Sequence, residues 1–295
     1  MKVTPLPEAQ PRPRRVAVGT FDGVHMGHRE VIRGCDTVLT FDPHPQQVVS
    51  PDHQPPKLLA SFPIKRDLIA GLDVQELVVI PFDREFASRS AEDFVQHVLV
   101  DTLQATHVSV GENFRFGHKA KGDAELLRAQ DAFETRVVPL VEAAGETISS
   151  SHIRGLVAAG EVDKAAEFLG GPFLLEGEVA HGDKRGRELG FPTANIVPDD
   201  RLVVPGHGVY AAWAHGHPAA VNVGVRPMFE TGRGLLVEAY LIDFSGDLYG
   251  QTLRVAFVER MRGEKRFESV EALVDQMKRD VGLAREITAA TVPRR

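Results

Sequence analysis

Residues 19–28 read GTFDGVHMGH and place one acid, three glycines and two histidines within a short stretch. Such a stretch buries little apolar surface, so packing does not explain it. A glycine-rich turn that leads into a helix exposes backbone N–H groups to an anion. His25 and His28 are three residues apart, so both rings can face one bound phosphate and donate hydrogen bonds as negative charge develops. The pattern predicts a phosphate site that Gly27 opens to a nucleotide.

Two ordinary interpretations of the histidine pair stay open on these residues alone. The rings could be solvent-facing loop histidines, or they could be half of a metal site. A zinc site needs further ligands, and Cys35 is the only cysteine, so no cysteine cluster supplies them. The chain has no GxxxxGK[ST] motif, which excludes a P-loop enzyme.

Three further segments carry related chemistry next to other expected strands. They read TFDPHP at 40–45, GENFRFG at 111–117 and SSSHIR at 149–154. Serine hydroxyls at a helix start, together with Arg154, can form a second phosphate cradle. A simple N-cap beside a surface arginine is the commoner interpretation of that segment alone. Because ligands bind beyond the carboxyl ends of parallel strands, we expect the four segments to converge at one sheet edge.

The first half of the chain has the pattern of an α/β domain. Short β-branched runs alternate with stretches of helical spacing, which predicts a parallel sheet covered on both faces. The expected strands are 15–19, 37–41, 77–81, 107–111 and 136–141. The clearest helix is 91–103, with Ser90 as its N-cap.

The second half has a different texture. Two short helices, 152–159 and 161–169, precede Gly170-Gly171-Pro172, where we place the boundary between domains 1–170 and 171–295. Beyond it, strand-like runs separated by glycine-rich turns predict an antiparallel barrel or sandwich. These runs are 173–179, 209–214, 219–223, 235–242 and 252–258. An amphipathic helix from Ser269 to about Ile287 closes the chain.

The barrel half carries candidate groups of its own. Residues 181–195 read HGDKRGRELGFPTAN, a Gly/Lys/Arg loop able to close over phosphates, followed by the hard oxygen donors of Thr193 and Asn195. Those donors suit a magnesium ion shared with ATP, although a basic surface hairpin is slightly favoured for this segment alone. Glu238 in LLVEAYLIDF can act as a general base, or it can be a solvated strand glutamate.

Composition limits the class of protein. The chain has 295 residues and a formal net charge of −7, which argues against a nucleic-acid partner but not against small anions. No apolar run approaches the roughly 20 residues of a membrane helix. Residues 1–15 are polar with four prolines and no apolar core, so they predict a disordered start rather than a signal peptide. We expect a cytosolic protein without membrane contact.

GTFDGVHMGH, TFDPHP, GENFRFG and SSSHIR together resemble the adenylylating half of the prokaryotic bifunctional riboflavin kinase/FAD synthetases. These enzymes are similar to the HIGH-motif nucleotidylyltransferases. The resemblance implies a Rossmann-like domain in which FMN phosphate attacks the α-phosphate of ATP, giving FAD and pyrophosphate. It implies that His25 and His28 stabilise the transition state. The implied nucleotide and phosphate contacts are Gly19, Phe21, Asp22, Gly23, Gly27, Asn113, Ser150, Ser151 and Arg154.

HGDKRGRELGFPTAN, VNVGVRP, VEAYLIDF and GDLYG resemble the riboflavin kinase barrel of the same family. By that resemblance Thr193 and Asn195 bind the Mg²⁺ of MgATP, and Glu238 deprotonates the ribityl 5′-hydroxyl of riboflavin. The implied nucleotide contacts here are Gly182, Lys184 and Gly186. The implied flavin contacts are Arg260, Arg262 and Phe267.

The expected protein is therefore a two-step enzyme whose substrates are ATP, riboflavin and FMN. We expect it to be a monomer or a weak oligomer. One departure from the family pattern matters: only residues 29–35 separate the histidine motif from the next strand, which is short for a crossover. An alternative is a riboflavin kinase whose adenylylation domain is impaired by this short crossover. A flavin-binding sensor is a second alternative, but it needs neither Thr193 and Asn195 nor the base Glu238.

Overall fold

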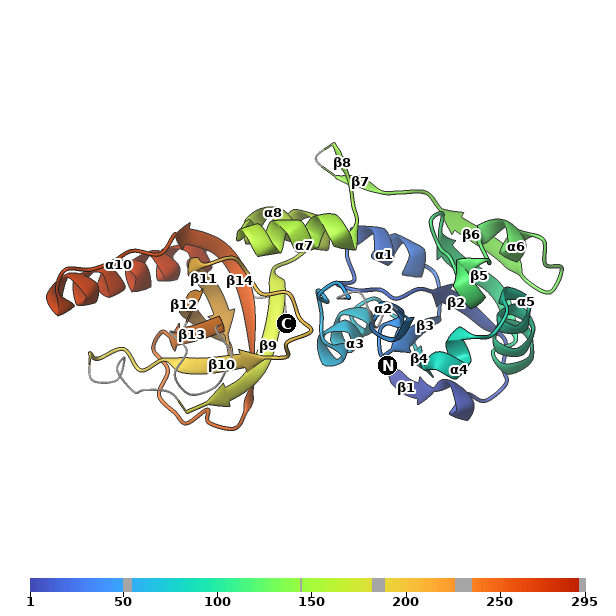
Figure 1. Cartoon of the computed structure of the whole chain (residues 1–295), viewed down its shortest axis with the longest axis horizontal. Coiled ribbons are helices and arrows are strands. Elements are labelled where there is room, and N and C mark those ends of the chain that lie inside the picture. The colour runs from blue at the N-terminus through green and yellow to red at the C-terminus, as the bar shows by residue number, and fades with distance from the viewer. Residues whose placement is uncertain (50–54, 144, 182–188, 226–234, 292–295) are drawn as a thin grey trace. The chain divides into compact units, whose positions relative to one another are not determined.

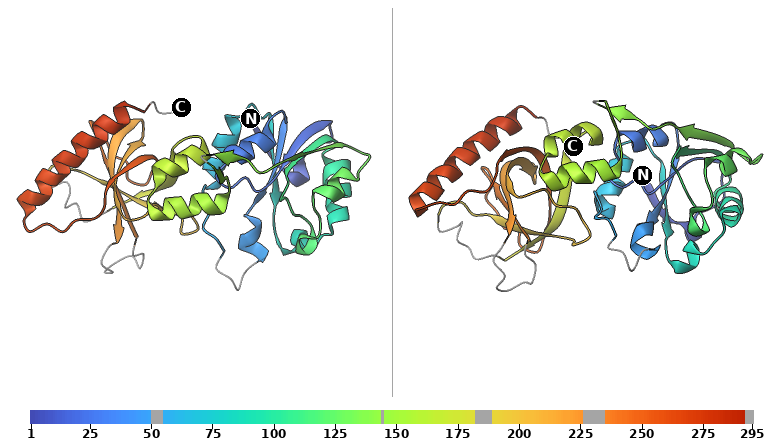
Figure 2. Two further views of the ribbon diagram at one scale, coloured as in Figure 1. Left: turned by 90° about the horizontal axis from the view of Figure 1, so that it is seen from above. Right: turned by 45° about the horizontal axis from the view of Figure 1, so that its top comes forward.

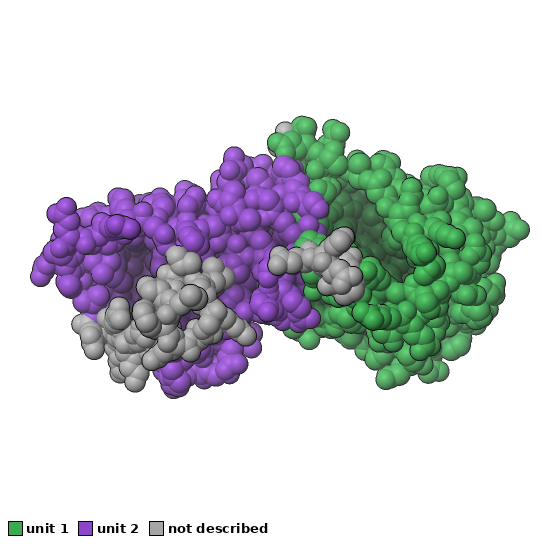
Figure 3. Space-filling view, viewed as in Figure 1, with its two compact units in different colours: residues 1–56, 62–150 green, residues 57–61, 151–295 purple. Residues whose placement is uncertain are grey.

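The computed structural model describes residues 1–49, 55–143, 145–181, 189–225 and 235–291. Its contacts divide the chain into two compact units (Figure 3). Unit 1 comprises Met1–Pro56 and Phe62–Ser150, and unit 2 comprises Lys57–Ser61 and Ser151–Arg295. None of the described helices is both long enough and apolar enough to cross a membrane.

Unit 1 contains a six-stranded sheet in the order β1-β4-β3-β2-β5-β6, and every strand pair in it is parallel (Figure 1). The chain moves from β2 through β3 to β4 in one direction and then returns to β5 and β6 on the other side of β2. Ligands of such sheets bind where this reversal occurs, here between β2 and β5. The strands are β1 (Lys2–Pro5), β2 (Arg14–Val18), β3 (Thr37–Asp42), β4 (Glu76–Pro81), β5 (Ala105–Gly111) and β6 (Glu134–Val138).

Both faces of this sheet are covered, as the alternating strand pattern predicts. Ala17, Val38 and Leu77 pack with α1 (Met26–Ile32) and α3 (Phe62–Ala70) on one face. On the other face the strands pack with η2 (Phe94–Thr102) and α6 (Ala124–Arg128). Smaller elements complete the unit: η1 (Leu6–Glu8), α2 (Pro45–Val49), α4 (Arg84–Ala87), α5 (Ala91–Asp93), η3 (His118–Ala120), β7 (Glu142–Ala143) and β8 (Glu146–Thr147).

Two expectations for unit 1 need correction. The proline-rich start is not disordered: β1 pairs in parallel with β4, and Thr4 Oγ1 donates a hydrogen bond of 2.8 Å to buried Glu76. Proline is tolerated there because an edge strand leaves some N–H groups unpaired. The helix expected at 91–103 starts with Ser90 as its N-cap, but most of it is the π-helix η2 rather than an α-helix.

Unit 2 contains a closed six-stranded barrel in the order β10-β13-β12-β11-β14-β9, and all its described pairings are antiparallel (Figure 2). Its strands are β9 (Phe173–Ala180), β10 (Ala194–Pro198), β11 (Gly208–Ala214), β12 (His217–Val225), β13 (Leu235–Leu241) and β14 (Thr252–Arg262). The sequence did not predict β10. The expected last helix is α10 (Val270–Ala289), capped by Ser269 and packed on β11 and β12.

Helices α7 (Ser150–Ala159) and α8 (Val162–Leu169) precede the barrel. The sequence places the domain boundary after them, at 170, whereas the contacts divide the chain at 150. The physical reason is that α8 packs against β14 and β9, with Phe168 and Leu169 buried. Residues 57–61 also belong to unit 2, because Leu58 bridges Leu202 and the Ser61 hydroxyl donates to Glu176.

Candidate functional site

The turn after β2 has an irregular backbone that the strand end holds in place. Phe21, Gly23 and Val24 have positive φ angles of 50°, 82° and 45°. Non-glycine residues adopt this left-handed region at a cost that is commonly accepted at functional sites. The turn is secured to β3 by the Thr40 hydroxyl, which donates a hydrogen bond of 3.2 Å to the Thr20 carbonyl.

His25 and His28 are brought together at the N-terminus of α1. His25 is the N-cap residue, and its Nδ1 accepts a hydrogen bond of 3.2 Å from the His28 N–H. A neutral His25 therefore carries its proton on Nε2. The two rings are stacked with centroids 3.5 Å apart, and the Phe21 ring meets His28 edge-on at 5.4 Å. The Nδ1 of His28 is buried and has no hydrogen-bond partner among the described residues.

The environment holds both imidazoles neutral. Burial lowers the pKa of His25 to about 4, and only a backbone hydrogen bond opposes this. Burial also lowers the pKa of His28 well below its usual value, with additional contributions from His25 and Lys65. Two neutral rings at a helix N-terminus are donors without full charge, suited to phosphate oxygens whose negative charge grows during a reaction.

Lys65 of α3 is a site residue that the sequence interpretation missed. Its side chain is buried, and its Nζ donates to the Phe41 carbonyl at 3.2 Å and to the Thr20 carbonyl and Thr40 Oγ1 at 3.4 Å each. Burial lowers the pKa of Lys65 to about 8, while Asp42 and Asp22 act in the opposite direction. No periodicity marks it, because lysine in an amphipathic helix normally faces solvent.

The short segment 29–35 is long enough to connect α1 to β3 in this fold. Helix α1 has two turns, and β2 and β3 pair directly in the register Val16↔Thr37 to Val18↔Leu39. Val31 and Ile32 of α1 are buried against the sheet, and the Ser109 hydroxyl of β5 donates to the Val31 carbonyl at 2.7 Å. The helix that carries the histidines is therefore fixed to the strand on the far side of the switch point.

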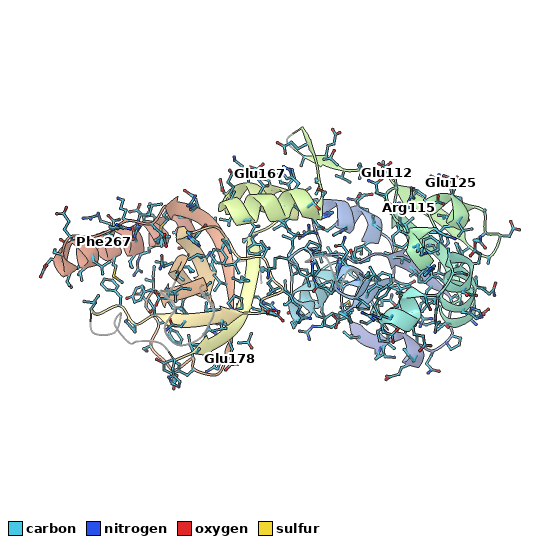
Figure 4. The ribbon with its side chains drawn as sticks, viewed as in Figure 1. Glu112, Arg115, Glu125, Glu167, Glu178 and Phe267 are labelled. Carbon is cyan, nitrogen blue, oxygen red and sulfur yellow. The ribbon has the colours of Figure 1, made fainter. Side chains whose placement is uncertain are left out.

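The other expected contacts of this site lie in different surroundings. Asp22 is buried, and the Ser150 hydroxyl donates to the Asp22 carbonyl at 3.0 Å. Asn113 is exposed in the turn after β5, whose flanking Glu112 and Arg115 are labelled in Figure 4. Ser151 and Arg154 belong to unit 2, where the Arg154 guanidinium donates to the Ser151 hydroxyl at 3.1 Å.

The barrel places three polar side chains in one row across neighbouring strands. Asn195 of β10 pairs with Glu238 of β13, and Asn222 of β12 pairs with Glu238 from the other side. Directly paired residues project to the same face of a sheet. All three are half-buried, and their sequence neighbours on the opposite face are buried: Ala194, Ile196, Val221, Val223, Val237 and Ala239. Thr193 is half-buried and immediately precedes β10, so the register of the strand does not assign its side chain to either face.

Asn222 was not assigned a role from the sequence. It lies in the VNVGVRP segment and follows the alternation of a strand with one buried face, but only the register of β12 with β13 places it beside Glu238. Gly182, Lys184 and Gly186 lie outside the described residues, so the predicted loop contacts with nucleotide are not tested.

The expected flavin contacts have partners within the protein. Arg262 forms a two-pronged ion pair with buried Asp280 of α10, at 2.7 and 3.1 Å. Arg260 donates to the His207 carbonyl. Phe267 is half-buried beside α10 (Figure 4). Contact of these residues with a flavin stays a prediction.

Comparisons with known proteins match the two halves of the chain to two different family models. Residues 8–152 match the family model described as FAD synthetase, and residues 169–288 match the one described as riboflavin kinase. A bifunctional riboflavin kinase/FMN adenylyltransferase of Listeria monocytogenes is 36% identical over 90% of this chain and 89% of its own length. That of Escherichia coli K12 is 35% identical over 94% of each chain.

A solved structure described as a macrolide-efflux protein from Streptococcus pneumoniae also aligns with the whole chain. It has a TM-score of 0.86 and 31% identity, and the alignment covers 97% of this chain and 99% of that one. The two family models and the length of the sequence matches show that this chain belongs to the family of bifunctional riboflavin kinase/FMN adenylyltransferases.

Proposed function

We propose that this chain phosphorylates riboflavin to FMN in unit 2 and adenylylates FMN to FAD in unit 1, with ATP as the second substrate of both reactions. The observation that carries the proposal is that each unit holds its own constellation: the stacked histidines at the start of α1, and the row of Asn195, Glu238 and Asn222 on the barrel. Both constellations suit the same substrate, because each has groups that can bind the polyphosphate of ATP.

In the kinase reaction, Glu238 accepts the proton of the ribityl 5′-hydroxyl. The resulting oxygen attacks the γ-phosphorus of ATP, the bond to the bridging oxygen breaks, and ADP leaves. A carboxylate flanked by two amides suits this role because amide N–H groups hold its oxygens in one orientation. Asn222 is the residue paired with Glu238 on the β12 side.

In the adenylylation reaction, an oxygen of the FMN phosphate attacks the α-phosphorus of ATP and pyrophosphate leaves. The protein supplies positioning and charge stabilisation rather than a covalent nucleophile. The Nε2–H of His25 and the ring of His28 donate to the phosphate oxygens that gain negative charge. Ser150 and Asp22 fix the turn beside them.

Magnesium fits the donor set of the barrel site. Thr193 supplies a hydroxyl oxygen and Asn195 an amide oxygen, both of the hard type that Mg²⁺ prefers. Thr193 and Asn195 would hold the ion together with the nucleotide. The ion supplies charge neutralisation on the transferred phosphoryl group. Because MgATP is the substrate, we assign both reactions to the cytosol. We further propose that the chain is a monomer or a weak oligomer.

The test is a time course of flavins. The purified chain is incubated with riboflavin, ATP and magnesium, and riboflavin, FMN and FAD are separated by chromatography. We expect FMN first and FAD afterwards, and FAD directly when FMN is supplied. Accumulation of FMN without FAD, even from supplied FMN, would overturn the assignment of unit 1, and absence of both products would overturn the whole proposal.

A further inference from the structure

Lys65 is a buried cation that the two reactions described so far do not use. Its side chain is 7% exposed, although α3 packs on the sheet through apolar residues such as Leu68 and Ile69. Burying an ammonium group is costly unless it is paired and hydrogen-bonded, and a methionine would fill similar space without that cost. A charge in this place therefore calls for a reason other than packing.

The contacts of Lys65 join two strand ends of the nucleotide edge. Its Nζ reaches the Thr20 carbonyl, two residues after β2, and the Thr40 hydroxyl and Phe41 carbonyl in β3. Thr40 itself donates to the Thr20 carbonyl, so the three groups form one small network. The turn held in this way carries Asp22, His25 and His28.

The groups around Lys65 come from the turn after β2, the end of β3, α3 itself and the start of α1. Asp22 of the turn and Asp42 at the end of β3 favour its charged form, and the Phe62 ring of α3 lies 5.6 Å from its Nζ. On the other side, Lys65 acts on His28 and helps to keep that ring neutral, together with His25. The ammonium group therefore affects both the position and the protonation state of the histidine pair.

We propose that Lys65 is a positioning residue for FMN adenylylation: its ammonium group ties the turn after β2 to the end of β3 and so fixes His25 and His28 relative to the bound phosphates. This inference rests on the proposed adenylyltransferase function of unit 1. It deepens that function by adding a residue that never touches substrate, and it involves no covalent step.

The experiment compares Lys65→Met, which removes the charge at similar volume, with Lys65→Arg, which keeps it. Lys2→Met is the matched control, since Lys2 lies on the edge strand β1 with a side chain 66% exposed. Each full-length variant is assayed for FAD formation from FMN and ATP, with kcat and KM measured from about pH 6 to about pH 10. Riboflavin phosphorylation in the same samples, and the unfolding transition of unit 1, serve as internal controls.

We expect Lys65→Met to lower kcat for FAD formation by about tenfold or more, with a smaller change in the KM for ATP, because a small misplacement of reacting groups costs rate rather than binding. Riboflavin phosphorylation stays unchanged. In the wild type, kcat falls as the pH rises through about 8, where Lys65 loses its proton. Lys65→Arg recovers part of the rate and lacks this alkaline decline, since arginine stays charged.

Three results would overturn the proposal. They are a wild-type kcat in Lys65→Met, an alkaline decline that persists in Lys65→Arg, and an equal loss of both activities. If Lys65→Met fails to fold in unit 1, the pH profile of Lys65→Arg decides on its own. Failure of the proposed function is distinguishable, because the wild type would then form no FAD.

Discussion

At the scale of single residues, the histidine pair combines a chemical advantage with a cost in stability. Stacking at 3.5 Å beside the Phe21 ring removes both imidazoles from water, which keeps them neutral, as the proposed donation to phosphate requires. The same burial means that the folded chain resists protonation that the unfolded chain accepts readily. The free energy of unfolding must therefore depend on pH in the acid range.

The lowered pKa of His25 determines the direction in which the free energy of unfolding changes with pH. Its pKa is about 4 when folded and 6.5 when unfolded, so between these values the unfolded state binds more protons and unit 1 loses stability as the pH falls. We expect His25 to contribute a loss of about 2 kcal/mol between pH 7 and pH 5. Urea unfolding of unit 1 at both pH values measures it.

The variant His25→Asn should reduce this slope, because asparagine keeps an N-cap acceptor but does not titrate in this range. Part of the slope should remain, because burial also lowers the pKa of His28. His97→Asn is the matched control, since His97 is exposed on η2. An identical slope in the wild type and in His25→Asn would show that another group carries the acid sensitivity.

Glu238 separates the two activities. Glu238→Gln keeps the size of the side chain but removes the proposed base, so FMN formation should fall by about a thousandfold. FAD formation from supplied FMN should be unaffected, because it belongs to unit 1. Glu178→Gln on β9 is the control: Glu178 is an exposed strand carboxylate of the same barrel (Figure 4). Survival of kinase activity in Glu238→Gln would refute its assignment as the base.

The sequence predicts some of these residues and not others for a clear reason. His25, His28, Glu238 and Asn195 stand in motifs whose composition departs from ordinary loops and strands. Lys65 stands in an unremarkable helix, and its importance arises only when β2 and β3 end side by side above it. A contact between distant segments leaves no local pattern in either of them.

At the scale of helices and strands, local patterns again predict some elements, while others depend on contacts between distant segments. Alternation and helical spacing predict β2 to β6 within a few residues, because each packs an apolar face. The strands β1 and β10 are short and carry proline, so their pairing with β4, β9 and β13 comes from tertiary contacts that local propensity does not encode. The two-turn α1 is enough for the crossover because β2 and β3 are direct neighbours.

The start of α1 offers a test at this scale. A Cβ at Gly27 would lie 3.3 Å from the Cε1 and Nδ1 of the His25 ring, closer than most such contacts, so the ring must shift. Alanine also favours a helix by up to about 1 kcal/mol over glycine. Gly27→Ala should thus leave unit 1 at least as stable while lowering FAD formation by about tenfold.

The matched control for Gly27→Ala is Gly282→Ala in α10, where no atom lies within 4 Å of the added Cβ. It should gain helix stability without a change in either activity. Calorimetry and the two flavin assays measure both variants. An unchanged rate of FAD formation in Gly27→Ala would mean that the position of the His25 ring does not limit the reaction.

At the scale of the whole molecule, the two units do not follow the order of the chain completely. Residues 57–61, from the N-terminal part of the sequence, belong to unit 2, where Leu59 and Ala60 are buried. The family models leave residues 153–168, most of α7 and α8, unmatched between them. Composition places a boundary at the Gly170-Gly171-Pro172 break, but the break only ends α8, whose apolar face still needs the barrel.

This partition predicts how the kinase unit can be isolated. A fragment 151–295 keeps α8, whose Val162, Ala165, Phe168 and Leu169 are buried, whereas a fragment 171–295 exposes the barrel surface that they cover. Each large apolar side chain that is lost removes about 2 kcal/mol. The shorter fragment should therefore unfold at lower urea concentration and lose riboflavin phosphorylation at a lower temperature. Both fragments lack residues 57–61, so their difference reports α7 and α8 alone, and equal stability would place the functional boundary at 170.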